Sequence, residues 1–204
     1  MANVELNPVF EGFSKKVGHL VFYKRNGKTF SRKSPAPRKS DSEKQVQVRK
    51  SFLTATAAWR QVKGVIQMSW KSAAQKKGQS GYNTFMEKNI EKVRNGIALI
   101  LSMSFGMESI ENLTVKSGGT GEISCEFTLP GAGGHLYFFT QKKENETVSD
   151  ILKRYDAGDS PASPFIIGGL ESGADYIVYG MTTDAPFSEA KLVSASSSGE
   201  TKAG

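Results

Sequence analysis

Residues 20–33 read Leu-Val-Phe-Tyr-Lys-Arg-Asn-Gly-Lys-Thr-Phe-Ser-Arg-Lys, and this stretch decides the fold of the front of the chain. Asn26-Gly27 lies between two runs of β-prone residues, which is the strongest short-range signal for a hairpin with a two-residue turn. Such a turn pairs residue 25 with 28, 23 with 30 and 21 with 32, and period-2 alternation places all six side chains on one face. The sequence therefore predicts a two-stranded ribbon with one face that is aromatic in the middle and cationic at the edges.

Two interpretations of this face stay open. In the functional interpretation the ribbon lies along a phosphate backbone, with Tyr23 or Phe30 available for stacking. Arg25, Lys28 and Arg32 then contact phosphates, and a bound anion relieves the repulsion between the facing residues 25 and 28. In the structural interpretation the two aromatic residues form a cross-strand pair that packs on the following helices, and the cations are only solvated.

Three short amphipathic helices are predicted after the ribbon. Residues 34–40 contain two prolines and form a basic linker that cannot be helical. Ser40 and Glu43 have the spacing of a capping box, so we expect a first helix over residues 41–63 with Gly64 as its stop. A second helix is predicted over 66–77 and a third over 80–95. The residues that we expect in their core are Trp59, Trp70, Tyr82 and Phe85.

The basic residues of this half continue from the ribbon into the linker and the first helix. Arg49, Arg60 and Lys63 fall on one side of that helix, away from its apolar stripe. We expect no sequence preference from a surface of this kind, because it offers contacts mainly to phosphates. The predicted nucleic-acid-binding residues are Tyr23, Lys24, Arg25, Lys28, Phe30, Arg32, Lys33, Arg38, Lys39, Arg49, Arg60 and Lys63.

Charge is divided very unequally along the chain. Residues 1–95 contain 20 Lys or Arg and 6 Asp or Glu, whereas residues 96–204 contain 7 and 14. This asymmetry predicts that the front half seeks nucleic acid or another polyanion. Attraction between the oppositely charged halves, within one chain or between chains, is a further interpretation and would produce self-association.

The helical period ends near Gly96 and short alternating apolar runs follow. Gly, Pro, Asn and Asp interrupt these runs at the spacing expected of an antiparallel β-sandwich. The predicted strands are 123–129, 135–140, 165–167, 176–179 and 192–195. We therefore predict an α+β fold with two domains. Its expected parts are a basic hairpin-plus-helix module (1–95), a connector (96–106), a β-sandwich domain (107–198) and a mobile tail (199–204).

One resemblance concerns the basic half. Residues 17–28 read Val-Gly-His-Leu-Val-Phe-Tyr-Lys-Arg-Asn-Gly-Lys, and Arg32, Gln45, Arg49, Phe52, Trp59, Trp70 and Gly-Tyr-Asn-Thr-Phe at 81–85 follow them. This pattern resembles an uncharacterised family of small bacterial proteins from Bacteroidetes-type genomes and mobile-element neighbourhoods. The resemblance covers about residues 12–95. It implies a recurring module and a phage or mobile-element context, and no established activity.

A second resemblance concerns the back half. Residues 170–179, Leu-Glu-Ser-Gly-Ala-Asp-Tyr-Ile-Val-Tyr, are similar to the segment before a late strand of fibronectin type III domains. This similarity implies that Tyr176 makes a corner hydrogen bond. Residues 124–130 resemble the early strand of that fold, with Phe127 where the family usually has tryptophan. The resemblance covers about residues 107–198 and implies a fibronectin type III or immunoglobulin-like sandwich, a binding or spacing module.

No convincing active site emerges from the motifs. The two histidines, His19 and His135, fall in different predicted domains, and neither has a sequence neighbourhood typical of a Ser-His-Asp site. The single cysteine, Cys125, lies on the apolar face of its strand, which indicates an inert core thiol. Zinc-like spacing and a phosphate-binding loop are absent from the sequence. We therefore expect a protein that is not an enzyme, without cofactor or metal.

Two functions remain in competition. The leading hypothesis is a non-enzymatic interaction protein whose basic N-terminal module binds nucleic acid through phosphates, with a protein partner for the sandwich. The alternative is a phage or mobile-element structural or assembly protein, with an anchoring basic region and a displayed immunoglobulin-like domain. A secretory signal and a long apolar run are absent from the sequence, so we expect no membrane partner. We expect a cytoplasmic protein, or one assembled into a particle after synthesis there.

Overall fold

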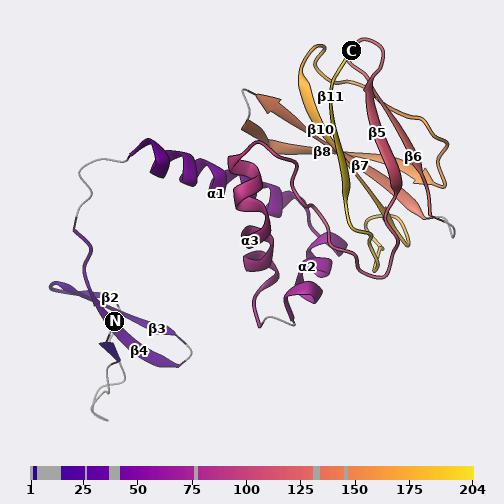
Figure 1. The fold of residues 1–204 in the computed structure, drawn as a ribbon. Coiled ribbons are helices and arrows are strands. Elements are labelled where there is room, and N and C mark those ends of the chain that lie inside the picture. Colours follow the sequence, from indigo (N-terminus) through magenta and orange to yellow (C-terminus); the bar gives the residue numbers. More distant parts are fainter. Residues whose placement is uncertain are drawn as a thin grey trace. The chain divides into compact units, whose positions relative to one another are not determined.

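The computed structural model describes residues 2–3, 15–25, 27–36, 42–75, 78–130, 134–144 and 147–204 (Figure 1). The chain divides into two compact units, Met1–Ser42 and Glu43–Gly204. The α+β class is confirmed, because the described residues form three helices and several antiparallel sheets. The predicted two-domain layout is not confirmed, because the structure divides after residue 42 and places the helices in the same unit as the sandwich.

The first unit contains a four-stranded antiparallel sheet with the order β1-β4-β3-β2. Its strands are β1 (Ala2–Asn3), β2 (Lys15–Val17), β3 (Leu20–Arg25) and β4 (Lys28–Lys33). The predicted hairpin is formed by β3 and β4. Gly27 of its turn has a φ of 75°, in the left-handed region that glycine adopts readily. Asn26, the other predicted turn residue, lies outside the described residues.

The second unit begins with the three predicted helices. They are α1 (Glu43–Gln61), α2 (Val65–Gln75) and α3 (Gly81–Arg94). Gly64, with a φ of 68°, separates α1 from α2. Ser80 caps α3, because its hydroxyl accepts a hydrogen bond from the Asn83 N–H at 3.1 Å. Ser40, the predicted cap of α1, lies outside the described residues.

A β-sandwich of two antiparallel sheets follows the helices. Its strands are β5 (Glu111–Ser117), β6 (Ile123–Thr128), β7 (His135–Glu144), β8 (Thr147–Asp159), β9 (Phe165–Ile167), β10 (Asp175–Thr183) and β11 (Ser197–Lys202). One sheet has the order β5-β6-β9 and the other β11-β10-β7-β8. The Tyr176 hydroxyl accepts a hydrogen bond from the Glu171 N–H at 3.2 Å, as the predicted tyrosine corner requires. The architecture is that of immunoglobulin-like and fibronectin type III domains, so the predicted sandwich is confirmed.

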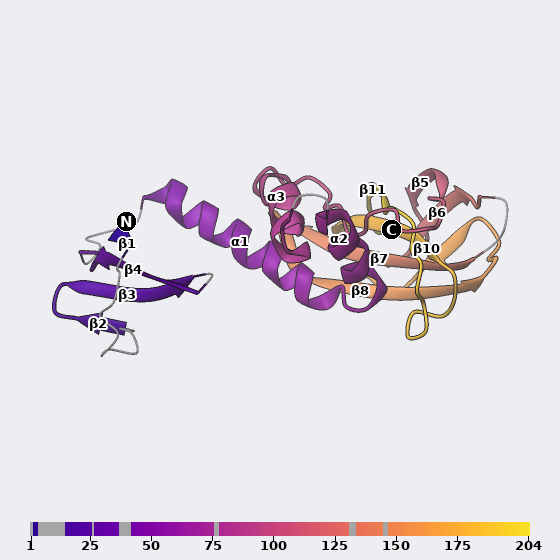
Figure 2. The ribbon, with the colours of Figure 1, turned by 90° about the horizontal axis from the view of Figure 1, so that it is seen from below.

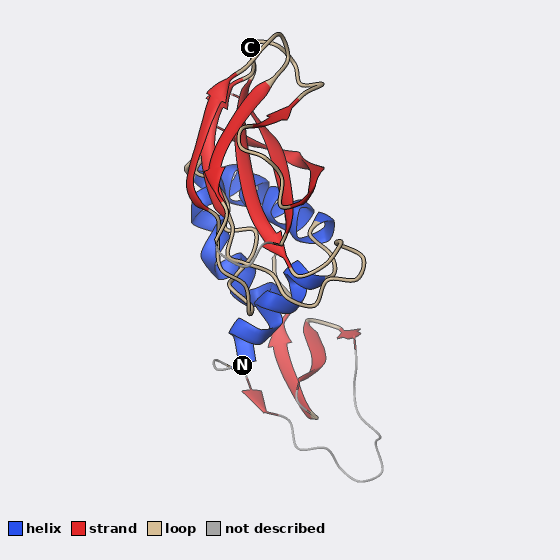
Figure 3. Ribbon diagram, turned by 90° about the vertical axis from the view of Figure 1, so that its right-hand side faces the viewer, coloured by secondary structure: helices blue, strands red, loops and turns tan. Residues whose placement is uncertain are grey.

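Both faces of β7 and β10 are buried. Leu136 and Phe138 of β7 join the core between the two sheets, together with Val178 of β10. Tyr137 and Phe139 point the other way, into a second core that includes Trp70 and Phe85 of the helices. The helices therefore cover the outer face of the four-stranded sheet, as Figure 2 and Figure 3 show.

Helix α1 also contacts the edge of this sheet, where β8 is the outermost strand. Gln61 Nε2 donates a hydrogen bond to the Asp150 carbonyl oxygen at 2.6 Å. Gln61 Oε1 accepts one from the Leu152 N–H at 2.9 Å. One side-chain amide thus forms the pair of bonds that a residue of a neighbouring strand would form.

The segment predicted as a connector is part of the core. Leu101 is fully buried, and its carbonyl oxygen accepts a hydrogen bond from Trp70 Nε1 at 2.8 Å. The buried side chain of Asn89 bonds both backbone groups of Ile100, donating to its carbonyl at 3.0 Å and accepting from its N–H at 2.8 Å. Residues 96–106 therefore join the helices to the sheet as a structural layer and not as a spacer.

The predicted tail, residues 199–204, is also structured. β11 pairs with β10 from Asp175 opposite Lys202 to Gly180 opposite Ser197. The predicted strand at 192–195 is reduced to isolated bridges at Val193. The sequence Ser-Ser-Gly-Glu-Thr-Lys of β11 lacks apolar alternation, because the strand lies at the edge of its sheet, so periodicity did not predict it.

Candidate nucleic-acid interface

The structure confirms the register on which the predicted binding face depends. The three cross-strand pairs are Arg25 with Lys28, Tyr23 with Phe30 and Val21 with Arg32. Side chains directly opposite each other in an antiparallel pair point to the same side of the sheet. These six residues therefore form one surface, which we call the ribbon face.

Tyr23 and Phe30 form a stacked pair in the middle of the ribbon face. Their ring centroids are 5.8 Å apart and their planes differ by 24°. The guanidinium carbon of Arg32 lies 5.9 Å from the centroid of the Tyr23 ring, a cation–π distance. Both rings are half-buried, so part of each stays accessible for stacking on a base. The cross-strand pair of the structural interpretation is present, and it does not exclude the functional one.

Cations occupy the ends of the ribbon face. Arg25 and Lys28 are both exposed and lie opposite each other next to the turn. Like charges in this position repel each other, and an anion bound between them would remove that repulsion. Lys16 of β2 pairs with Val21 and so adds a further cation to the same side of the sheet. Sequence reasoning missed Lys16, although the doublet Lys15-Lys16 directly before the hairpin was a usable signal.

Two of the predicted residues lie on the opposite side of the ribbon. Lys24 pairs with Thr29, and Lys33 pairs with Leu20, so all four side chains point away from the ribbon face. Thr29 is buried on this side, whereas Leu20 is 44% exposed. Lys24 and Lys33 are exposed and contribute positive charge to the unit, but they do not lie beside the aromatic pair.

The other predicted residues do not belong to the described strands of the first unit. Arg38 and Lys39 lie outside the described residues. Arg49 and Arg60 belong to α1 in the second unit; they are eleven positions apart and so lie roughly 20° apart around the helix. Lys63 follows the end of α1 and is exposed. These three cations belong to the second unit.

The ribbon face has the chemistry of a phosphate-binding surface. Residues 15–25 and 27–36 contain no Asp or Glu, so no acidic side chain within these stretches neutralises it. Guanidinium and ammonium groups bind phosphate oxygens, and half-exposed aromatic rings stack on bases of any sequence. The cations within the same described stretches are Lys15, Lys16, Lys24, Arg25, Lys28, Arg32 and Lys33.

His135 has carboxylate neighbours that the sequence did not indicate. Its Nε2 lies 2.6 Å from Asp156 Oδ1, and its Nδ1 lies 2.8 Å from Asp159 Oδ1. Both ring nitrogens are therefore engaged, and the ring links β7 to the end of β8. Burial acts to raise the pKa of Asp156, but the hydrogen bonds from His135 and the Gly158 N–H outweigh it and hold this pKa below its ordinary value. The cluster is an electrostatic link between strands.

Cys125 is the one thiol of the chain and is fully buried. Burial raises its pKa to about 12, so the thiolate is not formed near neutral pH. Within the part of the chain that the structure describes, no three His, Cys, Asp or Glu residues are grouped to hold a metal ion. None of the helices in that part is long and apolar enough to cross a membrane.

Comparisons with solved structures find matches that each cover about half of this chain. No family model and no curated protein matches the chain, so the resemblance to a bacterial hairpin family is not confirmed. A myokine structure matches 48% of this chain and 98% of its own at 14% identity and a TM-score of 0.39. The FN5 domain of Drosophila Lar matches 47% and 96% at 14% identity and a TM-score of 0.34. The fn3 domain of human collagen alpha-1(XX) chain matches 50% and 90% at 18% identity and a TM-score of 0.36. The sandwich assignment rests on the strand order of the two sheets.

Proposed function

We propose that this chain is a non-enzymatic interaction protein whose basic first unit binds nucleic acid, mainly through phosphates. The ribbon face is the contact surface. Arg25, Lys28 and Arg32 bind phosphates, and the Tyr23–Phe30 pair stacks on exposed bases. The binding is largely independent of sequence, because phosphate contacts position a strand without reading it.

One observation supports this proposal above the others. The register puts two like charges, Arg25 and Lys28, directly opposite each other beside an accessible aromatic pair. That arrangement is unfavourable for a free hairpin and favourable for one bound to an anion. A single small anion would satisfy the two cations but would not use the rings, whereas single-stranded nucleic acid offers phosphates and bases together.

The test is a salt series with the full chain. Binding of a labelled single-stranded and a labelled double-stranded DNA is followed by fluorescence anisotropy. For duplex DNA the log–log salt slope is about −0.9 per phosphate contact, so removal of three contacts should flatten it by about 2.7. The variant is Arg25→Ala/Lys28→Ala/Arg32→Ala, which removes three cations of the ribbon face and leaves the aromatic pair.

The matched control is Lys71→Ala/Lys191→Ala/Lys202→Ala. It removes three exposed cations of the second unit and changes the net charge by the same amount. It should leave the slope unchanged. Equal slopes in the wild type and both variants would exclude the ribbon face, and loss of binding in both would indicate an effect of net charge alone.

A second function, that of an assembly protein which displays the sandwich, is favoured by one different observation. The helices cover the outer face of the four-stranded sheet, whereas within the described residues of the second unit no helix joins the core cluster of the β5-β6-β9 sheet. Ile166 of β9 is 47% exposed there. Sedimentation velocity tests this function. Concentration-dependent assembly of the wild type that Ile166→Asp abolishes, together with no binding of DNA, would favour the assembly function over nucleic-acid binding.

A further inference from the structure

A pocket of about 320 Å³ lies in the second unit between α1, α3 and the start of β8. This volume is at the lower end of the range of ligand sites and suits one or two side chains of a peptide. Val93 and Val148 are almost fully buried and make its apolar floor, and Leu53 of α1 stands at its rim with 67% of its surface exposed. An apolar side chain from a partner would cover the part of Leu53 that the described part of the chain leaves exposed.

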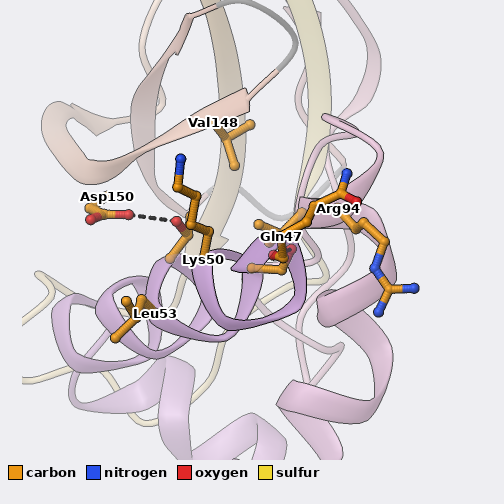
Figure 4. A pocket seen from close by; sticks show the side chains of 9 residues that line it. Gln47, Lys50, Leu53, Arg94, Val148 and Asp150 are labelled. Carbon is orange, nitrogen blue, oxygen red and sulfur yellow. Dashed lines mark hydrogen bonds between the residues drawn. The ribbon is translucent and has the colours of Figure 1, made fainter. Parts of the chain in front are cut away.

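Two cations line the pocket. Lys50 belongs to α1 and Arg94 to the last turn of α3. Within the described part of the chain neither forms an ion pair with an acidic side chain. Figure 4 shows Lys50 reaching toward Val148, while the guanidinium of Arg94 is well apart from it on the other side of Gln47. The two positive groups are therefore suited to two separate carboxylates rather than to one.

The polar groups of the walls distinguish between classes of ligand. The Ser51 hydroxyl donates to the Gln47 carbonyl oxygen at 3.0 Å, and the Thr54 hydroxyl donates to Asp150 Oδ1 at 2.6 Å, so both are already engaged. The Asp150 carboxylate is itself part of the wall and can accept a hydrogen bond, which a peptide N–H can donate and a phosphodiester cannot. The floor is aliphatic and offers no ring on which a base could stack. These features disfavour nucleic acid here.

We propose that this pocket binds an acidic peptide segment of a partner protein, in which one apolar side chain lies between two carboxylates. The apolar side chain enters between Leu53, Val93 and Val148. One carboxylate binds Lys50 and the other Arg94. Asp150 accepts a hydrogen bond from a backbone N–H of the peptide through the oxygen that Thr54 does not use. The first unit and its ribbon face take no part, so this site is independent of the proposed function.

The test uses the full chain with labelled methyl groups and a panel of defined peptides. Each peptide is a capped Ser/Gly chain that contains Asp-x-Φ-x-Asp or Asp-Φ-Asp, with Leu, Ile or Phe at Φ; a second panel has Lys in place of Asp. At least one acidic peptide should shift the methyl resonances of Val93 and Val148 saturably, with a Kd below about 1 mM. The lysine panel should leave them unchanged.

Two variants with the same change in net charge sharpen the result. Lys50→Glu/Arg94→Glu should weaken binding about tenfold or more, whereas Lys71→Glu/Lys88→Glu, at exposed positions that do not line the pocket, should leave it within about twofold. Leu53→Asp, at an exposed position, should abolish it without unfolding the helix. The proposal is overturned by an acidic panel that shifts nothing at about 2 mM, by equal binding of the lysine panel, or by a single-stranded oligonucleotide that shifts the same methyl groups.

Discussion

The ribbon of the first unit and the β7–β10 pair of the second are both antiparallel, yet their surroundings are opposite. On the ribbon the aromatic pair is half-buried and cations flank it. On β7 and β10 every second residue faces the other sheet and the residues between them face the helices, so both faces are buried. A strand covered on both sides needs a continuous apolar run, whereas a strand with one open side can carry function there. The comparison shows an accessible charged and aromatic face on the ribbon, and two buried cores on either side of β7 and β10.

The largest effect is expected where the helices meet the sandwich, at Trp70. This residue is fully buried, packs edge-on against Phe85 at 5.2 Å and bonds the Leu101 carbonyl. Trp70→Ala should lower the free energy of unfolding of the second unit by about 3 to 5 kcal/mol. Urea denaturation is followed by far-UV circular dichroism and by the methyl resonances of Ile123, which lies in the core between the sheets. Both signals should report the same lowered midpoint.

Met68→Ala is the control for this prediction. Met68 lies on the same helix and is 44% exposed, so its truncation should change the unfolding free energy by less than about 0.5 kcal/mol. In Trp70→Ala, a lowered midpoint of the circular dichroism signal with an unchanged midpoint of the Ile123 signal would show that the helices and the sandwich unfold separately. The sandwich could then no longer be described as stabilised by the helices on its outer face.

A smaller effect is expected from a single hydroxyl in the same core. The Tyr179 hydroxyl donates to Gln141 Oε1 at 2.7 Å and accepts from the Leu99 N–H at 3.1 Å. Tyr179→Phe leaves both partners buried and unpaired, so it should cost about 1 to 3 kcal/mol in thermal or urea unfolding. Tyr155→Phe is the matched control, because the Tyr155 hydroxyl is buried without a partner in the described structure. Its removal should be neutral or stabilising, and equal losses in both variants would contradict this explanation.

On the ribbon, the corresponding change should affect binding more than stability. Phe30→Leu keeps an apolar side chain beside Tyr23 but removes the ring. If the ring stacks on a base, the affinity for single-stranded DNA should fall by about 1 kcal/mol, roughly fivefold. Anisotropy titration of the full chain measures it, with Ile166→Ala as a control for loss of an exposed apolar side chain on another strand. Unchanged affinity in Phe30→Leu would make the aromatic pair structural only.

The smallest effect concerns acid stability at His135. Burial acts to raise the pKa of Asp156, but the hydrogen bonds from His135 and Gly158 lower it below its ordinary value. The Asp156 carboxylate therefore stabilises the folded state, and this contribution is fully present above the ordinary carboxyl pKa of about 3.9. That stabilisation is lost as the pH falls through the lowered value. The side chain is 56% exposed, so it contributes less than about 1 kcal/mol. Asp156→Ala should lower the Tm slightly near pH 6, and this difference should shrink as the pH falls through the lowered pKa; a difference that does not shrink on acidification would exclude this cause.

Local patterns were sufficient for the elements that are stabilised locally. The hairpin register follows from Asn26-Gly27 and strand alternation, and the Ser80 cap and Gly64 stop follow from their neighbours in sequence. The packing of the helices on the sandwich could not be predicted in this way. It depends on the segment 96–106, whose short apolar run has no period that distinguishes a buried layer from a linker.

The site was predictable to the same extent. The six residues of the ribbon face were predicted from the sequence. The position of Lys16 on the same side of the sheet could not be predicted, because it depends on the pairing of β2 with β3. His135 is separated from Asp156 and Asp159 by 21 and 24 residues, and a bulge in the β7–β8 pairing brings the three together. Sequence spacing contains no signal for contacts of that kind, because they depend on strand register.

The two hydrogen bonds from Gln61 to β8 also affect how the edge of the sheet can pair with other molecules. The outer edge of a sheet is a template on which a strand from another molecule can add, and repeated addition leads to fibres. At Asp150 and Leu152 both backbone groups of that template are already held by a side chain of the same molecule. A strand from a neighbouring copy could pair at these two residues only by displacing this internal amide. The start of the β8 edge is therefore protected from strand addition by a side chain of the same molecule.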